Sequence, residues 1–419
     1  MANQEAAPLV VNGKPRFYYG YIIVAAAGST QLIFHGIINT FGIFFKPLLA
    51  EFGWSRATLS GASSISFLII GSVSILVGGL IDRVGPRIVM VVCGLFFGTG
   101  IFLMSQVHSI WQLYLFFGVI VGIGLSAGDV IPLSITARWF VKKRGMMSGI
   151  VKVGTGMGMF IMPLVASGLI ATYSWRTSYV ILGVLALVSL VALAQLMRRD
   201  PSQMQQLPDG EEQITADSVN SIGGGLSLQE AVHTRQFWTF CAVFLVLVFA
   251  SNTILIHIVP HARDTGISAL SAATILSVLG GVSIVGRLVM GGSGDRIGNK
   301  LALIICFAIL LVTMLWLQIA GDLWMFYLFA AIYGFAHGGF FALVSPTVAE
   351  LFGIRAHGMI LGIVLFSGTI GGGIGSVLAG YIFDITNSYQ MVFLILAVLS
   401  ITGLILTTGL RPISVGGDE

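Results

Sequence analysis

Long apolar stretches separated by short polar ones follow one another along nearly the whole chain. A helix of about 20 apolar residues crosses the hydrocarbon core of a bilayer. The pattern therefore predicts an all-α membrane protein with twelve transmembrane helices, at residues 19–46, 58–81, 88–107, 111–137, 146–172, 176–197, 237–262, 269–293, 301–320, 324–349, 358–383 and 388–410.

One long polar segment, residues 198–235, divides these helices into two groups of six. Its first part, RRDPSQMQQLPDGEEQITADSVNSIGGG, is rich in Gln, Ser, Asp and Glu, which is typical of a mostly flexible linker. Its last part, LSLQEAVHTRQFW, has the pattern of a short amphipathic helix at a membrane surface. The expected organisation is an N-terminal tail (1–18), a six-helix bundle (19–197), a linker (198–235), a second six-helix bundle (236–410) and a C-terminal tail (411–419).

Composition excludes a soluble protein. Of the 419 residues 56% are hydrophobic and 9% are charged, against about 25% charged residues in an average soluble domain. The formal net charge of +4 gives no reason to expect a nucleic-acid partner, because the position of the charges matters more than their sum. The lipid bilayer is the implied partner. The three cysteines lie far apart in apolar runs, so we expect no metal and no cofactor.

The positions of the cations set the orientation, since Lys and Arg concentrate on the cytoplasmic side of a membrane. With the N-terminus inside, fifteen of the 21 Lys and Arg residues fall in inner segments, and Lys152 and Arg287 fall within spans. The outer segments hold four: Lys46, Arg56, Arg176 and Arg263. We therefore expect a multi-pass protein of the plasma (inner) membrane, with both termini and the linker in the cytoplasm.

The two groups of helices repeat each other. GGLIDRVGPR (78–87) matches GGSGDRIGNK (291–300), and RGMMSGI (144–150) matches HGMILGI (357–363), both at an offset of 213 residues (82 to 295, and 145 to 358). Duplicated six-helix units are the architecture of secondary transporters whose site lies between the halves. The first segment, between predicted spans two and three, resembles the signature of the major facilitator superfamily, and the second resembles its weaker copy. The resemblance implies two six-helix bundles (the major facilitator fold) and alternating access.

Within that superfamily, four features resemble the monocarboxylate transporters and their bacterial oxalate/formate antiporter-like relatives. They are RFYYGY before span one, ARWFVKKRG after span four, HIVPHA in span seven and the arginine of span eight. Animal carriers of this branch have an Asp four residues before that arginine and a Lys in span one, where this sequence has Ser283 and Asn39. The oxalate carrier has a second cation in span eleven, where residues 358–380 contain none. One free cation suits a monoanion, and any proton coupling must use other residues.

Two acidic residues, Asp82 and Asp295, lie at cytoplasmic helix ends, each followed by an arginine, Arg83 or Arg296. A carboxylate at this place binds the N-terminal amides of the next or a neighbouring helix. We expect these four residues to form a conformational gate that holds one face of the transporter shut. The plainer interpretation is a tight glycine turn with cations that anchor the loop at the membrane.

Three fully charged side chains fall deep within predicted spans: Asp129, Lys152 and Arg287. Spans four and five form a hairpin about residue 141, so Asp129 and Lys152 lie at nearly the same depth, and we expect them to pair or to share a polar cluster. The pair is either architectural or proton-sensitive, because a desolvated carboxylate takes up a proton when its partner is drawn away. A contact of Asp129 with Arg287 is the alternative.

The arginine of span eight, Arg287, has no acid within reach on its own helix. The nearest, Asp295, is eight residues away, or about 12 Å along the axis. A guanidinium binds a carboxylate through two parallel hydrogen bonds and stays charged at any relevant pH. We therefore expect Arg287 to bind an anionic substrate, and the alternative is a packing arginine bonded to carbonyl oxygens or to Asp129.

Polar side chains in spans one, seven and ten supply further candidates, because the resemblance implies that these spans line the central cavity. We expect His35 and Asn39 in span one, and Tyr333 and His337 in span ten, to contact the substrate. Histidine titrates near neutral pH, so His257 in span seven is a candidate, with Asp129 and Lys152, for the coupling proton. A lone histidine in a helix is more often a hydrogen-bonded packing residue.

Small residues in spans five and eleven predict close helix contacts. Glycines four residues apart allow two helix backbones to approach each other. The pairs are Gly154 and Gly158, Gly368 and Gly372, and Gly371 and Gly375.

Together these features favour a secondary active transporter of a small monocarboxylate such as lactate or pyruvate, coupled to protons. Two alternatives stay open: an organic-anion exchanger of the oxalate/formate type, and a proton-driven exporter of lipophilic compounds. A non-transporting sensor would need a larger signalling domain than the tails and linker provide. No nucleophile–base pair or metal-ligand cluster indicates an enzyme. The oligomeric state is left open, with a monomer as one option.

Overall fold

The computed structural model describes residues 17–54, 56–210 and 225–412. Within them, twelve helices are long and apolar enough to cross a membrane, which confirms the predicted all-α fold with twelve spans. The predicted N-terminal tail up to residue 16, residues 211–224 of the linker and residues 413–419 of the C-terminal tail lie outside the described residues.

The N-terminal half supplies the first six spans. Its helices are α1 (Gly20–Asn39), α2 (Phe41–Phe52), α3 (Arg56–Val84), α4 (Pro86–Leu103), α5 (Ile110–Leu113), α6 (Gly122–Leu125), α7 (Ala127–Trp139), α8 (Arg144–Thr172) and α9 (Trp175–Leu196). The first span is built from α1 and α2. The fourth is built from α5, the π-helix η2 (Tyr114–Val121), α6 and α7.

The C-terminal half supplies the other six spans, each from one helix. They are α12 (Arg235–Asp264), α13 (Ala269–Ile297), α14 (Asn299–Trp316), α15 (Leu323–Phe352), α16 (His357–Thr386) and α17 (Gln390–Thr408).

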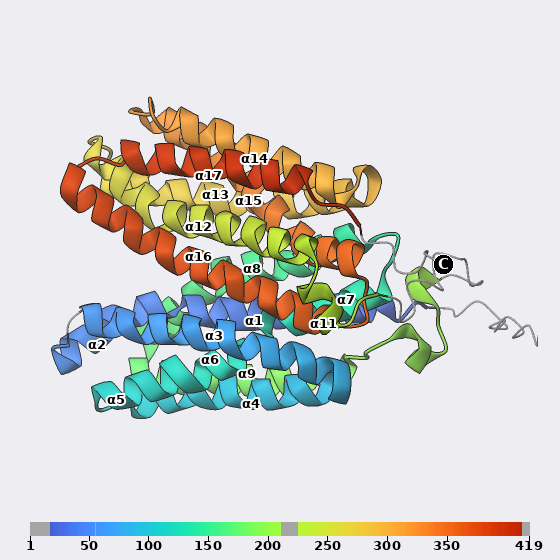
Figure 1. Ribbon diagram of the computed structural model, residues 1–419. Helices are drawn as coiled ribbons and strands as arrows, with labels where there is room; N and C mark the ends of the chain where they lie inside the picture. The colour runs from blue at the N-terminus through green and yellow to red at the C-terminus, as the bar shows by residue number, and fades with distance from the viewer. Residues whose placement is uncertain (1–16, 55, 211–224, 413–419) are drawn as a thin grey trace, which may run out of the picture.

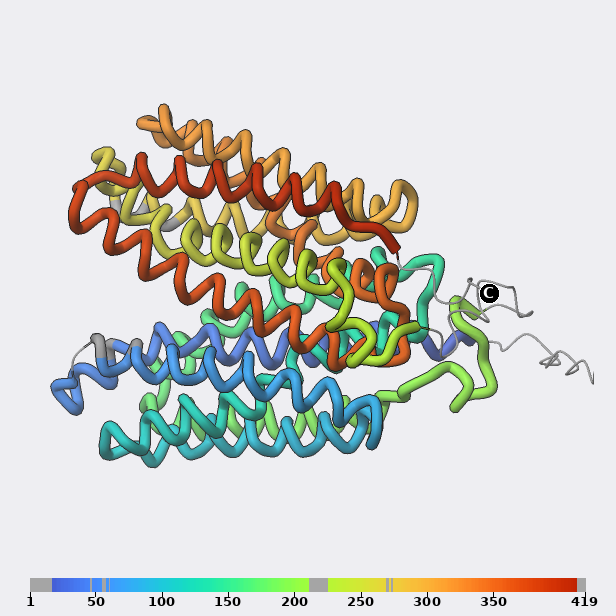
Figure 2. The backbone as a smooth tube through the Cα atoms, in the orientation of Figure 1, coloured from blue at the N-terminus to red at the C-terminus, as the bar shows by residue number. Residues whose placement is uncertain are grey.

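The two halves lie one above the other in Figure 1, with the blue-to-green N-terminal half below and the yellow-to-red C-terminal half above. Figure 2 follows the backbone from one half to the other, with the described parts of the linker on the same side as the end of α17. Helix α8 packs against α13, and α16 packs against α3, so these two pairs join the halves. The halves diverge toward the end away from the linker (Figure 1).

Glycines bring the halves into backbone contact near the linker. A Cβ atom at Gly291 of α13 would lie 2.4 Å from the carbonyl oxygen of Gly145 in α8. At Gly78 of α3 it would lie 2.2 Å from the carbonyl oxygen of Gly358 in α16. The two contacts are copies of one another in the sequence repeat, because 291 − 78 and 358 − 145 both equal 213.

Two further glycines fix where α3 and α13 end. Gly85 has φ +93° and Gly298 has φ +87°, a left-handed conformation that glycine adopts without a steric cost. The helices therefore continue to Val84 and Ile297. As a result, the predicted gate residues lie in the last helical turn of α3 and α13 rather than in an open loop.

The glycines predicted to allow close packing do so within each half. Cβ atoms at Gly154 and Gly158 of α8 would lie 2.0 Å and 2.4 Å from carbonyl oxygens of α1. At Gly371 and Gly375 of α16 they would lie 2.2 Å and 2.7 Å from carbonyl oxygens of α12. The predicted close backbone contacts are thus confirmed for these four glycines, whereas Gly368 and Gly372 face side chains of α12.

The first part of the linker is held against the N-terminal half. It contains two short 3-10 helices, η3 (Pro201–Met204) and η4 (Pro208–Gly210). The Asp209 carboxylate accepts hydrogen bonds from the backbone N–H groups of Val141 and Lys142, at 2.8 Å and 2.9 Å, in the turn between α7 and α8. The prediction of a mostly flexible linker is wrong for this part, because composition does not show that one carboxylate fits the exposed amides of a neighbouring turn.

The second described part of the linker contacts the C-terminal half. The predicted short helix is present as α11 (Leu228–Val232), and Ser227 and Glu230 form a capping box at its start. The backbone N–H of Leu226 donates a hydrogen bond to the carbonyl oxygen of Phe352 at the end of α15, at 2.9 Å. Each end of the linker is therefore attached to the bundle beside it.

The contact of α8 with α13 predicts that alanine substitutions at two adjacent glycines change the thermal stability differently. We expect Gly291→Ala to lower the thermal unfolding midpoint in detergent, because the new methyl group overlaps the α8 backbone and overpacking costs about 1–3 kcal/mol. Gly292→Ala is the matched control, since its Cβ would meet no atom within 4 Å. It should leave the midpoint unchanged or raise it, through better helix propensity. Equal midpoints for both variants would contradict this packing of α8 on α13.

Candidate functional site

The predicted pair of Asp129 and Lys152 is present. Asp129 lies in the first turn of α7, and Lys152 lies on α8 with its ammonium group donating to the Oδ1 atom of Asp129. The Lys152 side chain is 6% exposed, whereas that of Asp129 is 26% exposed. Space for water therefore adjoins the carboxylate at the middle of the spans.

The Oδ1 atom of Asp129 collects further N–H donors from α1. The amide nitrogen of Gln31 donates to it at 2.8 Å, and the Nε2 atom of His35 lies 3.3 Å away. The amide oxygen of Gln31 in turn accepts from the Thr155 hydroxyl of α8, at 2.5 Å. Three helices thus meet in one polar cluster, made of Gln31, His35, Asp129, Lys152 and Thr155.

Two members of this polar cluster, Gln31 and Thr155, were not predicted from the sequence. The available signal was the spacing of Gln31 and His35, four residues apart in the apolar run of α1 and hence on one helix face. Nothing along the sequence shows that this face meets α7.

On the other half, Arg287 of α13 is 4% exposed and is almost without partners. Its Nη1 atom donates to the Ser283 hydroxyl at 3.1 Å, one turn earlier in the same helix. Its Nε atom is buried and has no hydrogen-bond partner. Within the described part of the chain no carboxylate lies at ion-pair distance from Arg287, and Asp129 is the acid whose charge acts on it.

Glycines of α8 make room for Arg287. A Cβ atom at Gly156 would lie 2.7 Å from the Nη1 atom of Arg287, and one at Gly149 would lie 2.3 Å from its carbonyl oxygen. Because Gly149, Lys152 and Gly156 are three and four residues apart, they share one face of α8. That face therefore presents Lys152 and the space for Arg287 together.

The predicted residues Tyr333 and His337 lie on α15, which packs against α13 and its Arg287. The Nδ1 atom of His337 lies 3.0 Å from the Ser251 hydroxyl of α12, and its ring is 5.7 Å from that of Tyr333. The charge of Arg287 acts on His337. The ring of Phe341, one turn further, lies 5.1 Å from that of His337 and 6.0 Å from the Lys152 ammonium. These contacts link the C-terminal half to the polar cluster.

Two predicted site residues, Asn39 and His257, form their hydrogen bonds with groups other than the side chains of the polar cluster. The side-chain amide of Asn39 donates to the carbonyl oxygen of His35 at 2.6 Å, at the exposed end of α1. His257 contacts the Tyr389 hydroxyl (3.2 Å) and the carbonyl oxygen of Ser376 (3.1 Å). The structure thus groups His257 with α16 and the start of α17 and not with Asp129.

The gate candidates make contacts between the halves. The Asp295 carboxylate of α13 accepts hydrogen bonds from the backbone N–H groups of Gly145 and Met146, at 2.6 Å and 2.8 Å, at the start of α8. Asp82 of α3 lies near the start of α16, which packs against α3, and accepts a hydrogen bond from Arg138 of α7. Carboxylates at helix N-termini are favourable because the free N–H groups and the helix dipole attract them.

A cation that the sequence analysis treated only as an anchor, Arg138 of α7, binds one of the gate candidates. It donates to Asp82 at 2.9 Å, and to Asp200 of the linker at 3.4 Å. The other two gate candidates, Arg83 and Arg296, are exposed. The linker is thereby connected through Arg138 to the gate.

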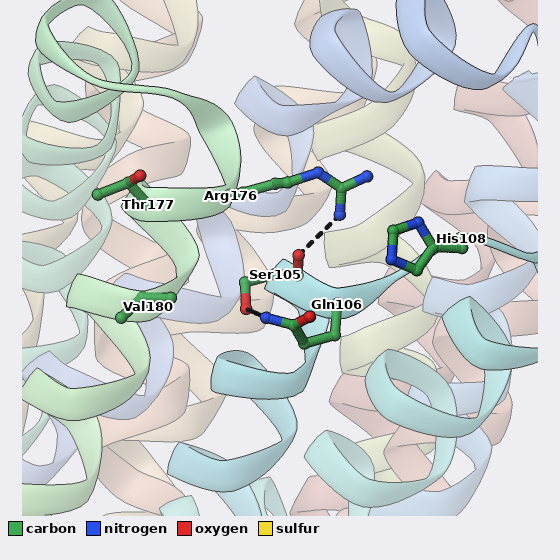
Figure 3. Close-up of a pocket in the computed structure, with 6 residues that line it drawn as sticks. All are labelled: Ser105, Gln106, His108, Arg176, Thr177 and Val180. Atoms are coloured by element: carbon green, nitrogen blue, oxygen red, sulfur yellow. Dashed lines mark hydrogen bonds between the residues drawn. The ribbon is translucent and has the colours of Figure 1, made fainter.

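A pocket of about 420 Å³ lies in the N-terminal half between the segment after α4 and the start of α9, and its lining includes Ser105, His108 and Arg176 (Figure 3). Its most prominent cation, Arg176, donates to the carbonyl oxygen of Ser105 (2.8 Å) and to Glu51 (2.6 Å). Arg176 and the Trp175 indole hold the pKa of Glu51 below its usual value. Arg176 is thus already neutralised, and this pocket offers no free cation to an anion.

The described residues contain no group of three or more His, Cys, Asp or Glu side chains that could hold a metal ion. The candidate site combines side chains from both halves. Its parts are a buried guanidinium in one half and a carboxylate shared by several donors in the other, between two bundles of membrane-spanning helices. Two bundles of membrane-spanning helices with a site between them are the architecture of a secondary transporter.

Comparison with known proteins identifies the family. A family model described as the Major Facilitator Superfamily matches residues 27–292 and 247–418. The chain belongs to this superfamily of transporters.

Among curated proteins, the chain is 26% identical over 396 residues to monocarboxylate transporter 13 of Bos taurus, covering 92% of this chain and 88% of that one. It is 26% identical over 399 residues to monocarboxylate transporter 2 of Homo sapiens, covering 92% and 84%. These relatives confirm the predicted resemblance to the monocarboxylate transporter branch.

Solved structures share the fold. The Escherichia coli fucose:proton symporter FucP superposes with a TM-score of 0.73 at 15% identity, over 95% of this chain and all of that one. The proton:xylose symporter XylE gives a TM-score of 0.71 at 14% identity, over 94% and 96%. At these identities the likeness concerns the architecture of the two bundles.

We expect that removal of Lys152 destabilises the protein and that a second substitution, at Asp129, restores the stability. Lys152→Met leaves the Asp129 carboxylate without its ammonium partner, a change that costs about 3–5 kcal/mol at buried sites. We expect a lower unfolding midpoint in a fluorescence-detected melt of the purified protein. Adding Asp129→Asn should restore most of the loss, and Lys143→Met, on an exposed residue, should change little. A double variant as unstable as Lys152→Met would show that the pair does not act as a unit.

Proposed function

We propose that the protein is a proton-coupled carrier of a small monocarboxylate, such as lactate or pyruvate, that works by alternating access in the plasma (inner) membrane with both termini in the cytoplasm. The observation that carries the proposal is Arg287, a buried guanidinium whose hydrogen-bond partner is one neutral hydroxyl. Burial of a charge in the membrane without a paired acid is costly. An anionic substrate that forms two parallel hydrogen bonds with the guanidinium would relieve that cost.

The surroundings of Arg287 favour a short monoanion. Tyr333, His337 and Phe341 follow one another at one-turn intervals on α15 and so share one helix face, and His337 is close enough to Arg287 for its charge to act on the imidazole. His35 and Asn39 of α1 would contact the substrate from the opposite half. Residues 358–380 of α16 contain no second cation that a dianion would need.

Asp129 supplies a reason for proton coupling. It is bonded to Lys152 and lies close enough to Arg287 for their charges to interact. A substrate carboxylate that binds Arg287 brings a second negative charge near Asp129, which favours the protonated form of the Asp129 carboxyl group. Anion and proton would therefore bind together. When both are absent, the Lys152 ammonium would balance the negative charge of Asp129. His257 remains a further candidate for a proton carrier near the start of α17.

The gate would then regulate access. Hydrogen bonds from the start of α8 to Asp295, and the packing of α3 with its Asp82 against α16, join the halves at their linker ends. These contacts, with Arg83 and Arg296 beside them, must break before the substrate can leave on that side. The conformation of the structure is the one in which they are made.

Substitution of Arg287 tests the proposal directly. We expect Arg287→Gln to reduce uptake of radiolabelled lactate into proteoliposomes, driven by an inward proton gradient, by roughly 100-fold, since two charged hydrogen bonds of about 1.5 kcal/mol each are lost. Uptake by Arg287→Lys should lie between that of the parent and that of Arg287→Gln, because lysine keeps the positive charge but cannot form two parallel hydrogen bonds. Arg355→Gln, on an exposed cytoplasmic loop residue, serves as the control. Uptake by Arg287→Gln at the parental rate would contradict the proposal. Transport of lipophilic cations without any transport of organic acids would also contradict it. A preference for oxalate over lactate would favour an organic-anion exchanger of the oxalate/formate type instead.

The close approach of Arg287 to Gly156 predicts that a small substitution at Gly156 weakens lactate binding. Gly156→Ala places a methyl group 2.7 Å from the Arg287 guanidinium and should displace it, raising the KM for lactate roughly 10-fold for a loss of about 1.4 kcal/mol in binding. Gly168→Ala, in the same helix but with no atom within 4 Å of the new carbon, should keep the parental KM. The check is the concentration dependence of uptake, and an unchanged KM in Gly156→Ala would be evidence against Arg287 as the anion site.

A further inference from the structure

The two oxygen atoms of the Asp129 carboxylate have different surroundings. Oδ1 is bonded by Gln31 and Lys152 and approached by His35. Oδ2 has no hydrogen-bond partner among the described residues, and it is not fully buried. One oxygen is therefore saturated with N–H donors, and the other is left open toward solvent.

The orientation of the Gln31 amide is fixed by three contacts. Gln31 is fully buried, and its amide nitrogen donates both to Asp129 and to the carbonyl oxygen of Gly128, at 2.9 Å. Its amide oxygen accepts from Thr155. Rotation of the amide by half a turn would place its oxygen against two acceptors, which is unfavourable. Gln31 therefore acts as a rigid donor that ties α1 to both the backbone and the carboxylate at the start of α7.

We propose that Gln31 is a positioning residue for the coupling proton. It holds Asp129 with Oδ1 engaged and Oδ2 open, so that a proton arriving from the water-accessible side is accepted at Oδ2. Its N–H also stabilises the charged carboxylate, which keeps Asp129 deprotonated until an anion has bound. This inference rests on the proposed function, because the proton in question is the one that accompanies the substrate.

Every charged group around Asp129 affects the pH at which its carboxylate takes up a proton. Lys152 of α8 and Arg287 of α13 favour the charged carboxylate, as does His35 of α1 when it is protonated. Removing Gln31 leaves all three in place. The effect of Gln31 on proton uptake is therefore separable from that of the cations.

The test compares Gln31→Leu with the parent and with Thr30→Val, a matched control. Thr30 is the preceding buried residue of α1, and its hydroxyl bonds only to the carbonyl oxygen of Ala27, outside the polar cluster. Infrared titration of the purified, substrate-free protein follows the carbonyl stretch of a protonated carboxyl group, and Asp129→Asn identifies the band. The pH profile of lactate uptake is measured on the same set.

We expect the infrared midpoint of Gln31→Leu to lie about one pH unit above that of the parent, because a carboxylate that loses an N–H donor is protonated more readily. The uptake profile should move to higher pH by a similar amount. Thr155→Val should produce a smaller shift in the same direction, since it only frees the Gln31 amide. Thr30→Val should match the parent.

A midpoint of Gln31→Leu that coincides with those of the parent and Thr30→Val would overturn the proposal and leave Gln31 as a packing residue. The proposal also fails if the infrared midpoint moves while the uptake profile stays fixed, because Asp129 would then not carry the coupled proton. Failure of the proposed function looks different. In that case the parent itself takes up no monocarboxylate, although Gln31→Leu still shifts the band of Asp129.

Discussion

The charge of Arg287, held at the middle of a membrane-spanning helix, is the constraint on which the rest of the site depends. A guanidinium at this depth needs compensation, and its own helix offers one serine hydroxyl. Compensation has to come from the opposite half of the molecule. The α8 helix provides the room through Gly149 and Gly156, and α7 provides the negative charge through Asp129.

The same two helices carry both the site and the gate. On α8, the backbone amides of Gly145 and Met146 bind Asp295, and Gly156 lies against Arg287 about three turns further along. On α13, Arg287 and Asp295 are eight residues apart. Separation of α13 from α8 would therefore break the hydrogen bonds to Asp295 and disturb the surroundings of Arg287 in one movement. Packed interfaces of this kind switch between discrete arrangements instead of deforming gradually, which suits a carrier whose bound solute decides when the halves move.

Much of this architecture could be predicted from the sequence, because it follows from lengths and repeats. Helix rise placed Asp129 and Lys152 at one depth, and their pair is present. The 213-residue repeat located both gate aspartates, and Asp295 does bind a helix N-terminus. What could not be predicted depends on which helix faces meet. Gln31 joins the carboxylate only because its face of α1 turns toward α7, and Arg138 reaches the linker only because residues 200–210 fold back on the bundle. His257 could be placed on α12 but not beside Tyr389, which arrives from the start of α17.

The central claim is that Arg287 recognises the charge of a carboxylate, and it is tested most directly by equilibrium binding of lactate and of lactamide, its neutral amide, to the purified protein. Isothermal titration at one pH compares the two solutes, which have nearly the same shape. The account predicts heat of binding for lactate and none for lactamide at the same concentrations. Equal binding of both, or binding of lactamide alone, would contradict it.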